Sequence, residues 1–249
     1  MSDFLTLVSC ELIKLRRNLA LWMVGIAPLF VVSLQALIWL NLKEGLGFDA
    51  DLWLTFFSNI LSIWSLFMFP MFTSLVVALI YQYEHTTGGW LRTGTYPVPS
   101  WMILAAKQLS ALILLTGSTI LLVVFTVLGG WITGYFHPVI EMPALIPWPE
   151  VLVRTAKIWS ASLLVLGIQN WVSLRWTSLS VPIGTGIGGT FVALFATSWK
   201  YGYLYPWLLP LNSIYGTDGR DQIAFLTGAI GGMTVLILML ITERNTRKG

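Results

Sequence analysis

Charged side chains are scarce in this chain, and residues 83–107, between two of the longest apolar runs, gather several that could do chemistry. This stretch, YEHTTGGWLRTGTYPVPSWMILAAK, carries Glu84, His85, Arg92 and Lys107. Its glycines and prolines interrupt any helix through its middle, and Ser100 can cap a new helix that leads into the next apolar run. If the stretch faces the cytosol, it forms a short elbow that presents its charges to a soluble partner.

The motifs of common catalytic and cofactor sites are missing from the sequence. There is no GxxxxGK[ST], so the chain does not bind ATP through a P-loop, and there is no HExxH. Gly184, Gly186 and Gly189 match GxGxxG, but they lie in an apolar run with no preceding strand, which argues against a dinucleotide site. We therefore expect no catalytic residue, no metal and no cofactor in this chain. An intramembrane enzyme would need a constellation that we do not find.

The composition indicates an all-α integral membrane protein. Apolar residues make up 56% of the 249 and charged residues 10%, against about 25% charged in ordinary soluble domains. The 13 Trp residues fit a protein with aromatic side chains at the membrane surface. A net charge of +3 would elsewhere favour nucleic acid as a partner. Here the excess of basic charge is explained by membrane topology, and we expect no nucleic-acid binding.

The elements that position the elbow form one transmembrane domain over residues 1–249. Residues 1–17 predict an amphipathic helix at the membrane surface, with Phe4, Val8, Leu12 and Leu15 on one side. The alternative is the basic start of a signal peptide, but the following apolar run is too long and has no cleavage site. Six runs are long enough to cross about 30 Å of hydrocarbon. They cover residues 19–42, 53–82, 102–132, 151–174, 179–199 and 223–242.

Lys and Arg counts predict the orientation of the six spans. With the N-terminus inside, nine of these residues lie on the inner side and five on the outer side. Both termini and the elbow, residues 83–101, are then cytosolic, and His85 and His137 lie on opposite sides of the membrane. We expect a multi-pass protein of the bacterial cytoplasmic membrane.

Residues 200–222 predict an outer segment that dips back into the membrane interface. They are too aromatic and apolar for a free aqueous loop, and Tyr203, Tyr205 and Trp207 would hold them there. Such a segment either lines an exit path for a transported compound or is an aromatic belt with no other role. Both readings stay open at this point.

Small and polar residues inside the spans predict helix packing rather than ion binding. Gly184-x-x-x-Gly188 and Gly228-x-x-x-Gly232 are typical of closely packed helix faces. Gln169 and Asn170 favour hydrogen bonds between helices over contact with a substrate. No ionisable side chain lies in the middle of a span, whereas ion-coupled transporters usually need one there. Either the energy for transport comes from another subunit or the protein transports nothing.

The chain resembles the type-2 ATP-binding-cassette (ABC) permeases over essentially its whole length. The resemblance rests on the N-terminal ELIKLRRN, the six spans and the elbow E-H-x-x-G-G-W-L-R…P-V-P-S…K. Within that group, QNWVSLRWTSLSVPIGTGIGG followed by YPWLLP is similar to the permeases of lantibiotic self-immunity exporters.

This resemblance implies that separate subunits form the membrane path and hydrolyse ATP. The permease would dimerise with a second permease, identical or different, and would dock two separate ATPase subunits that bind ATP and Mg²⁺. The elbow would act as the coupling helix, for which Glu84, His85, Trp90 and Arg92 are the candidate residues. The first and fifth spans would flank the dimer seam, with Gly184 and Gly188 near it.

We therefore expect a permease that expels a hydrophobic or amphipathic compound from the membrane, such as a lantibiotic peptide. A drug or lipid exporter, and a membrane scaffold or receptor without transport, remain the alternatives. Co-purification with an ATPase would separate a permease from a scaffold.

Overall fold

The computed structural model describes residues 2–16, 18–42, 51–87, 98–137 and 142–246. Within these ranges the chain is helical and contains no strand. Five helical stretches are long and apolar enough to cross a membrane, and α9 (Ser180–Ala196) is a sixth, shorter apolar helix. The predicted all-α membrane fold is therefore confirmed.

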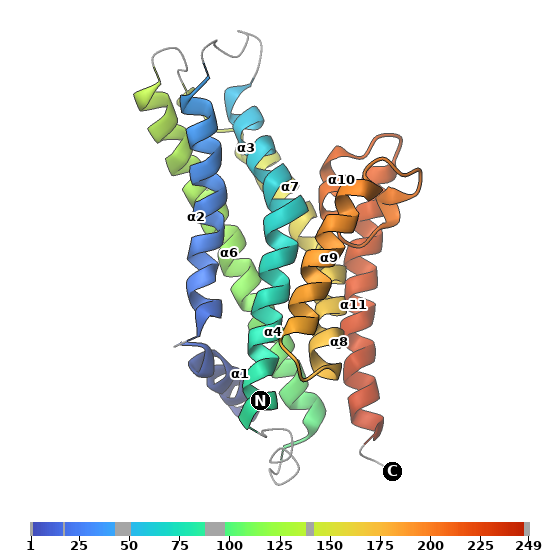
Figure 1. Cartoon of the computed structure of the whole chain (residues 1–249). Coiled ribbons are helices and arrows are strands. Elements are labelled where there is room, and N and C mark those ends of the chain that lie inside the picture. The colour runs from blue at the N-terminus through green and yellow to red at the C-terminus, as the bar shows by residue number, and fades with distance from the viewer. Residues whose placement is uncertain (1, 17, 43–50, 88–97, 138–141, 247–249) are drawn as a thin grey trace.

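The N-terminal helix α1 (Ser2–Leu15) lies at one end of the bundle, beside the first turns of α6 (Ser100–Phe136) (Figure 1). Val8 and Leu15 are buried on its inner face, as the amphipathic pattern predicts. The side chain of Asn18 caps α2 (Leu19–Leu40) by accepting a hydrogen bond from the amide of Ala20. Because Asn18 follows α1 almost directly, the chain turns from the first helix straight into the first span.

The second span is a composite of three pieces. It consists of α3 (Leu52–Ile63), a π-helical turn η1 (Trp64–Met68) and α4 (Phe69–Thr87). The carboxylate of Asp51 caps its start by accepting from the amide of Leu54 at 3.1 Å. The π turn is closed by the amide of Phe69 donating to the carbonyl of Trp64. Such turns insert one extra residue into a helix and bend it locally.

The elbow separates α4 from α6. Of the expected elbow, 83–87 end α4 and 98–101 lead into α6, while 88–97 lie outside the described residues, and with them Trp90 and Arg92. Pro99, in extended backbone, is the N-cap of α6, and Ser100 is its first residue. The predicted hydroxyl cap by Ser100 is therefore wrong, because proline fixes the backbone one residue earlier.

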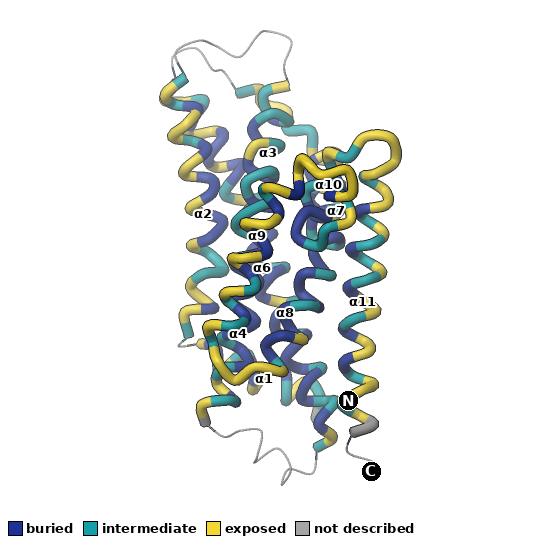
Figure 2. The backbone as a smooth tube through the Cα atoms, turned by 45° about the vertical axis from the view of Figure 1, so that its right-hand side comes forward, coloured by how far each residue is buried: buried dark blue, intermediate teal, exposed yellow. Residues whose placement is uncertain are grey.

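The remaining spans complete the bundle. α7 (Trp148–Ala161) and α8 (Leu163–Arg175) form the fourth span, α9 the fifth and α11 (Arg220–Thr246) the last. α2 packs along α6, α8 packs against α11, and α4 lies between α8 and α9. Bulky side chains such as Trp39, Trp64 and Phe72 fill the interior, while the outward faces of α2, α9 and α11 are exposed and apolar (Figure 2).

Residues 197–219 fold back against the bundle instead of leaving it. They form η2 (Gly202–Leu204) and α10 (Leu209–Tyr215), which packs on α7 and α11. Trp207 and Leu208 are buried in one cluster with Ala193 and Ala196 of α9. In Figure 1 this segment lies well below the upper ends of α2 and α3.

Both described ends of the chain lie at the same end of the bundle. α1 and the last turn of α11 are found there, together with the end of α4 and the start of α6 (Figure 1). We call this the terminal end, and the opposite one the far end.

Candidate functional site

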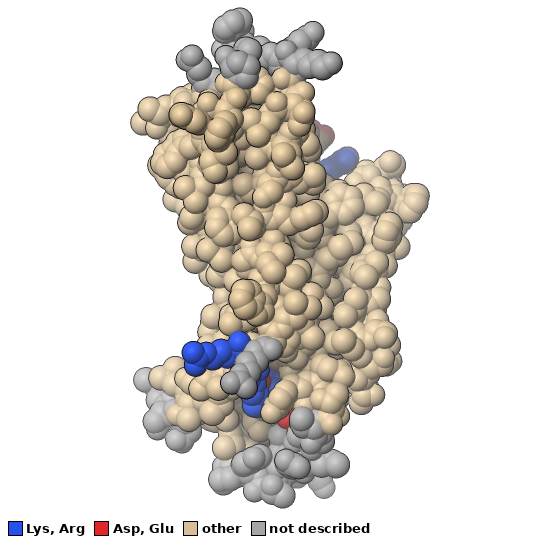
Figure 3. Space-filling model, turned by 60° about the vertical axis from the view of Figure 1, so that its left-hand side comes forward, with Lys and Arg blue, Asp and Glu red and all other residues tan. Residues whose placement is uncertain are grey.

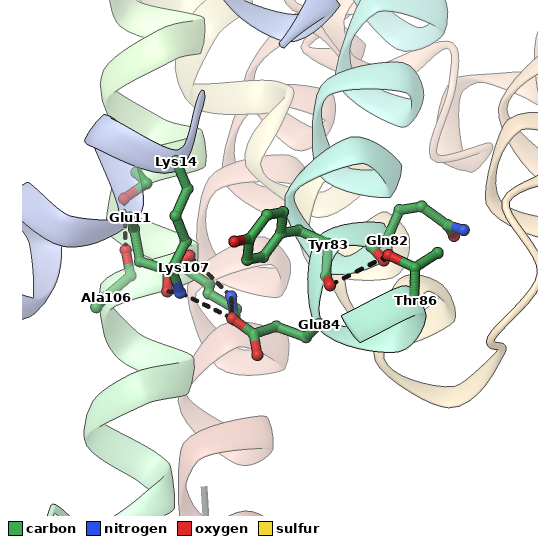
Figure 4. Close-up of polar contacts among 9 residues, drawn as sticks. Glu11, Lys14, Gln82, Tyr83, Glu84, Thr86, Ala106 and Lys107 are labelled. Atoms are coloured by element: carbon green, nitrogen blue, oxygen red, sulfur yellow. Dashed lines mark hydrogen bonds and ion pairs between the residues drawn. The ribbon is translucent and has the colours of Figure 1, made fainter. Parts of the chain in front are cut away.

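Four charged side chains meet at the terminal end. Glu11 and Lys14 come from α1, Glu84 from the last turns of α4 and Lys107 from the second turn of α6 (Figure 4). We call these residues the four-charge cluster. It joins the N-terminal helix to the two helices that flank the elbow.

Each lysine of the cluster contacts both glutamates. Lys14 Nζ lies 2.7 Å from Glu11 Oε1 and 2.8 Å from Glu84 Oε1. Lys107 Nζ lies 2.8 Å from Glu11 Oε2 and 3.2 Å from Glu84 Oε1. The four ion pairs close a ring whose formal charge is zero. Removal of any one member therefore leaves an unbalanced charge.

The cluster is almost sealed from solvent. Lys107 is 0% exposed and both glutamates are 6% exposed, whereas Lys14 is half-buried at the edge. Partial burial alone would lower the pKa of Lys14, but hydrogen bonds from its ammonium to Glu11 and Glu84 outweigh burial and raise that pKa above its ordinary value. Lys14 therefore stays charged at neutral pH.

Local sequence explains how each side chain reaches the cluster. Glu11 follows Val8 by three residues and precedes Leu15 by four, so it lies on the buried face of α1. Lys107 lies two turns into α6, where its long side chain can reach across to both glutamates. Sequence analysis singled out Glu84 but missed the roles of Glu11 and Lys14. The spacing of Glu11 from Val8 and Leu15 is the signal that could have placed it on the buried face of α1.

Glu84 uses only one of its carboxylate oxygens in these ion pairs. Oε1 accepts from both lysines, and in Figure 4 the second oxygen points away from them. The neighbouring ring of Tyr83 lies 5.6 Å from Lys14 Nζ, within the range of a cation–π contact. The ion pairs of the cluster thus use one oxygen of Glu84, and the second oxygen is not part of them.

His85, in the same turn of α4, contacts α8. Its Nε2 lies 3.0 Å from the carbonyl oxygen of Ser173 near the end of α8. Deeper in the bundle, Tyr81 donates a hydrogen bond to Asn170 of α8 at 3.0 Å. The last turns of α4 therefore contact α1 and α6 on one side and α8 on the other. Asn170 bonds to a neighbouring helix, as predicted.

The two glycines expected near a dimer seam lie on the outside of α9. A Cβ added at Gly184 or Gly188 would meet no atom of the described residues within 4 Å. Gly186 and Gly189 face inward instead, against Ser74 and the indole of Trp207. Within one chain, the GxGxxG pattern is thus divided between an inner packing face and an open outer face.

The three aromatic residues expected along an exit path lie in the segment between α9 and α11. Tyr205 and Trp207 stack with ring centroids 5.7 Å apart, and the Tyr205 hydroxyl donates to the carbonyl of Gly189 at 3.1 Å. Tyr203 lies beside Arg220, whose guanidinium is 5.5 Å from its ring. Two of the three residues thus anchor the segment to α9.

Among the described residues, no group of three or more His, Cys, Asp or Glu side chains could hold a metal ion. His85 and His137 lie at opposite ends of the bundle. His137 Nε2 is 3.0 Å from the carbonyl of Leu42, and His85 contacts α8 as described. The charged site of this protein is therefore an ion-paired junction between helices.

The family model described as ABC-2 family transporter protein matches residues 7–195, about three quarters of the chain. The chain belongs to the ABC-2 transporter family. No curated protein and no solved structure matches it. As an ABC-2 family member it is a multi-pass permease component of an ABC transporter, a membrane subunit that is not itself catalytic. The match covers α1 from residue 7 onward, the four-charge cluster and α9 up to residue 195.

Proposed function

We propose that this ABC-2 protein is the permease of an exporter that expels a hydrophobic or amphipathic compound, such as a lantibiotic peptide, from the bacterial cytoplasmic membrane. It works with two separate ATPase subunits, which bind ATP and Mg²⁺, and with a second permease subunit. The terminal end faces the cytosol in this proposal, in keeping with the Lys and Arg distribution.

The observation that carries the proposal is the four-charge cluster. A partner that pushes on the elbow, which includes Trp90 and Arg92, acts on the end of α4 and the start of α6. Glu84 and Lys107 connect those two helices, and Glu11 and Lys14 connect α1 to both. The three helices therefore move as one body, and His85 extends the connection to α8. Rigid-body motions of this kind are a common route for transmitting a ligand-driven change.

The second permease is proposed to pack against the open faces of α2 and α9. α4 separates these two helices, and both carry exposed apolar side chains, among them Phe30 of α2 and Phe191 of α9 (Figure 2). Gly184 and Gly188 leave room for a helix from the second copy to approach closely. The segment with Tyr203, Tyr205 and Trp207 then lies next to the seam at the far end, where an exported compound would leave.

The first experiment is co-purification of the tagged full chain from its native membrane, followed by mass spectrometry of the bound proteins. We expect an ATPase subunit with a P-loop in stoichiometric amount. A chain that is recovered without an ATPase would be a scaffold or receptor, and the transport proposal would fail. Reconstitution with that ATPase, tested with a lantibiotic, a drug and a lipid, identifies the substrate class by stimulation of ATP hydrolysis.

Coupling is tested with two variants that remove the same charge from neighbouring positions. Lys14→Gln breaks two ion pairs of the cluster, whereas Arg16→Gln neutralises an exposed cation without an ion pair among the described residues. Losing one partner of a charged pair that is largely buried costs about 2–5 kcal/mol. We therefore expect Lys14→Gln to reduce substrate-stimulated ATP hydrolysis more than tenfold at equal membrane abundance.

Arg16→Gln should retain stimulation within about twofold, because exposed charges contribute about 0–1 kcal/mol. Equal losses in the two variants would show that general positive charge at the membrane surface matters, and not the cluster. Unchanged stimulation in both would return the cluster to a purely structural role.

A further inference from the structure

A small hollow at the far end brings two cations to the side of a membrane-spanning helix. It has a volume of about 320 Å³, which is roughly ten times the share of one water molecule in the liquid. Figure 3 shows a basic and an acidic side chain at the edge of a notch near that end, on a face that is otherwise almost free of charge between the two ends. The hollow is lined by Pro149, Glu150, Val153, Arg154 and Lys157 of α7 and by Ile214 of α10.

Arg154 carries its charge without a carboxylate partner among the described residues. It is half-buried, and its guanidinium Nη1 donates to the hydroxyl of Ser58 on α3 at 2.8 Å. Lys157 lies one turn further along α7, where Nζ is 3.5 Å from Asp221 Oδ2 of α11. Arg154 lies six residues after Trp148, the first residue of α7, and is therefore roughly 9 Å along the helix from its start. Charged residues inside spans are costly, and they usually mark a ligand or ion site.

The chemistry of the hollow fits a phosphate group. Arginine presents several donors in a plane that matches phosphate oxygens, and the single bond to Ser58 leaves most of them unused. Lys157 adds further N–H donors from the same side of α7, although Asp221 balances its charge. Val153 and Ile214 provide apolar walls, which suit the ester and glycerol carbons next to a lipid phosphate. Glu150 is exposed at the rim, where its carboxylate opposes an anion weakly.

A second hollow, on the next face of the same helix, is apolar. It lies between α6 and α7, has a volume of about 790 Å³ and includes Trp148, Leu152 and Trp159. Leu152 lines this groove, and its neighbour Val153 lines the hollow with the cations. Both side chains are 56% exposed, so a molecule in the surrounding membrane can reach both sites. A hollow with an arginine that has no carboxylate partner among the described residues, next to an apolar groove, matches a phosphate headgroup attached to long hydrocarbon chains.

We propose that α7 holds a membrane phospholipid, with the phosphate against Arg154 and Lys157 and an acyl chain along the groove between α6 and α7. The site is distinct from the four-charge cluster, which lies at the opposite end of the bundle. The proposal concerns binding to the permease itself, and it requires neither ATP nor a partner subunit.

The test is lipid binding to the purified full chain in detergent, measured by native mass spectrometry. The probes are phosphatidylglycerol and a diacylglycerol with the same acyl chains but no phosphate. We expect saturable binding of phosphatidylglycerol and at least tenfold weaker binding of diacylglycerol. Inorganic phosphate in large excess should not displace the lipid, because it gains nothing from the groove. If phosphate alone binds as tightly as the lipid and depends on Arg154, the lipid proposal is overturned.

Three variants assign the binding to the hollow. Arg154→Gln should weaken phosphatidylglycerol binding at least tenfold, because it removes a charge-assisted hydrogen-bond donor. Lys200→Gln removes an exposed cation at the same end and should leave binding unchanged. Glu150→Gln removes an exposed carboxylate from the rim and should strengthen binding about two- to fivefold, in line with loss of a weak surface repulsion.

Glu150→Gln still tests the lipid proposal if Arg154→Gln does not fold. Glu150 has no ion pair among the described residues, and because it is exposed its replacement disturbs no packing. Unchanged or weaker binding in Glu150→Gln would overturn the proposal. Equal losses in Arg154→Gln and Lys200→Gln would also overturn it, since the attraction would then come from general surface charge.

Discussion

At the residue scale, the four-charge cluster fixes the relative positions of α1, α4 and α6 more than it stabilises the folded chain. Taking charges out of water is costly, and apolar replacements of a buried ion-pair network are often as stable as the network. Loss of one member has a different effect, because it leaves a buried charge without its partner. Lys107 shows this most clearly, since it is fully buried and holds a carboxylate from α1 and another from α4.

We predict that Lys107→Met destabilises the folded chain by about 3–5 kcal/mol, the range found when one partner of a buried pair is removed. The double variant Lys107→Met with Glu84→Gln removes one charge of each sign and should be more stable than the single variant. Denaturant titration of the purified full chain in detergent measures both. If the two losses simply add, Glu84 and Lys107 do not act on each other, and the ring of ion pairs is not the source of the effect.

At the scale of one element, α9 has two faces with different tasks. Its inner face carries Gly186 and Gly189, where the helix touches Ser74 and Trp207. Its outer face carries Gly184 and Gly188, followed by the exposed rings of Phe191 and Phe195. The same residue type therefore serves packing within the chain on one face and, in our proposal, packing between chains on the other.

We predict that Gly184→Leu and Gly189→Leu separate these tasks. A Cβ added at position 184 meets no atom of the described residues within 4 Å, so Gly184→Leu should fold normally and lose dimer, as measured by crosslinking in membranes. Leucine at position 189 collides with the Trp207 indole, and overpacking of this kind costs about 1–3 kcal/mol or more. Full dimer formation by Gly184→Leu would show that the second subunit packs elsewhere.

The elements were predictable from the sequence, whereas the cluster was only partly so. Runs of apolar residues mark membrane spans because a helix satisfies its backbone polar groups within its own segment. The signal for a span is therefore local in the sequence. The pairing of Glu11 with Lys107 joins residues that are 96 positions apart, and no local pattern specifies it. Glu84 stood out because it ends an apolar run. Glu11 did not, because a short surface helix tolerates acids on any side.

The glycine patterns also show that a local sequence pattern does not specify which residues are in contact. Gly228 and Gly232 lie against the backbone near Ala161 and Leu163, so the predicted close packing of that pair is confirmed. Gly184 and Gly188 have the same spacing, but a Cβ added at either one meets no atom of the described residues within 4 Å. Spacing shows that two helices can approach closely at such a face, but the rest of the fold decides whether the neighbour belongs to the same molecule.

At the scale of the whole molecule, labelling of one cysteine can measure the orientation of the chain in the membrane. Cys10 is the only cysteine of the chain and is exposed on α1, at the terminal end. We predict that a membrane-impermeant maleimide labels Cys10 only after the cells are opened, because the distribution of Lys and Arg predicts that this end faces the cytosol. The control is Thr217→Cys in a Cys10→Ser background. Thr217 is exposed at the far end and should be labelled in intact cells. Labelling of Cys10 in intact cells would reverse the orientation and remove the basis for cytosolic docking.

The unequal lengths of the spans have a consequence for the lipid around the protein. α9 has 17 residues, or roughly 26 Å of helix, whereas the hydrocarbon layer is about 30 Å thick. α6, on the opposite side of α4, has 37 residues. The bilayer must therefore thin where it meets α9, and such deformation costs fractions of a kcal/mol per Å of mismatch. A second copy placed against α9 replaces that strained lipid with protein. Membrane elasticity then adds to the association of two permeases, and it acts most strongly in thick membranes.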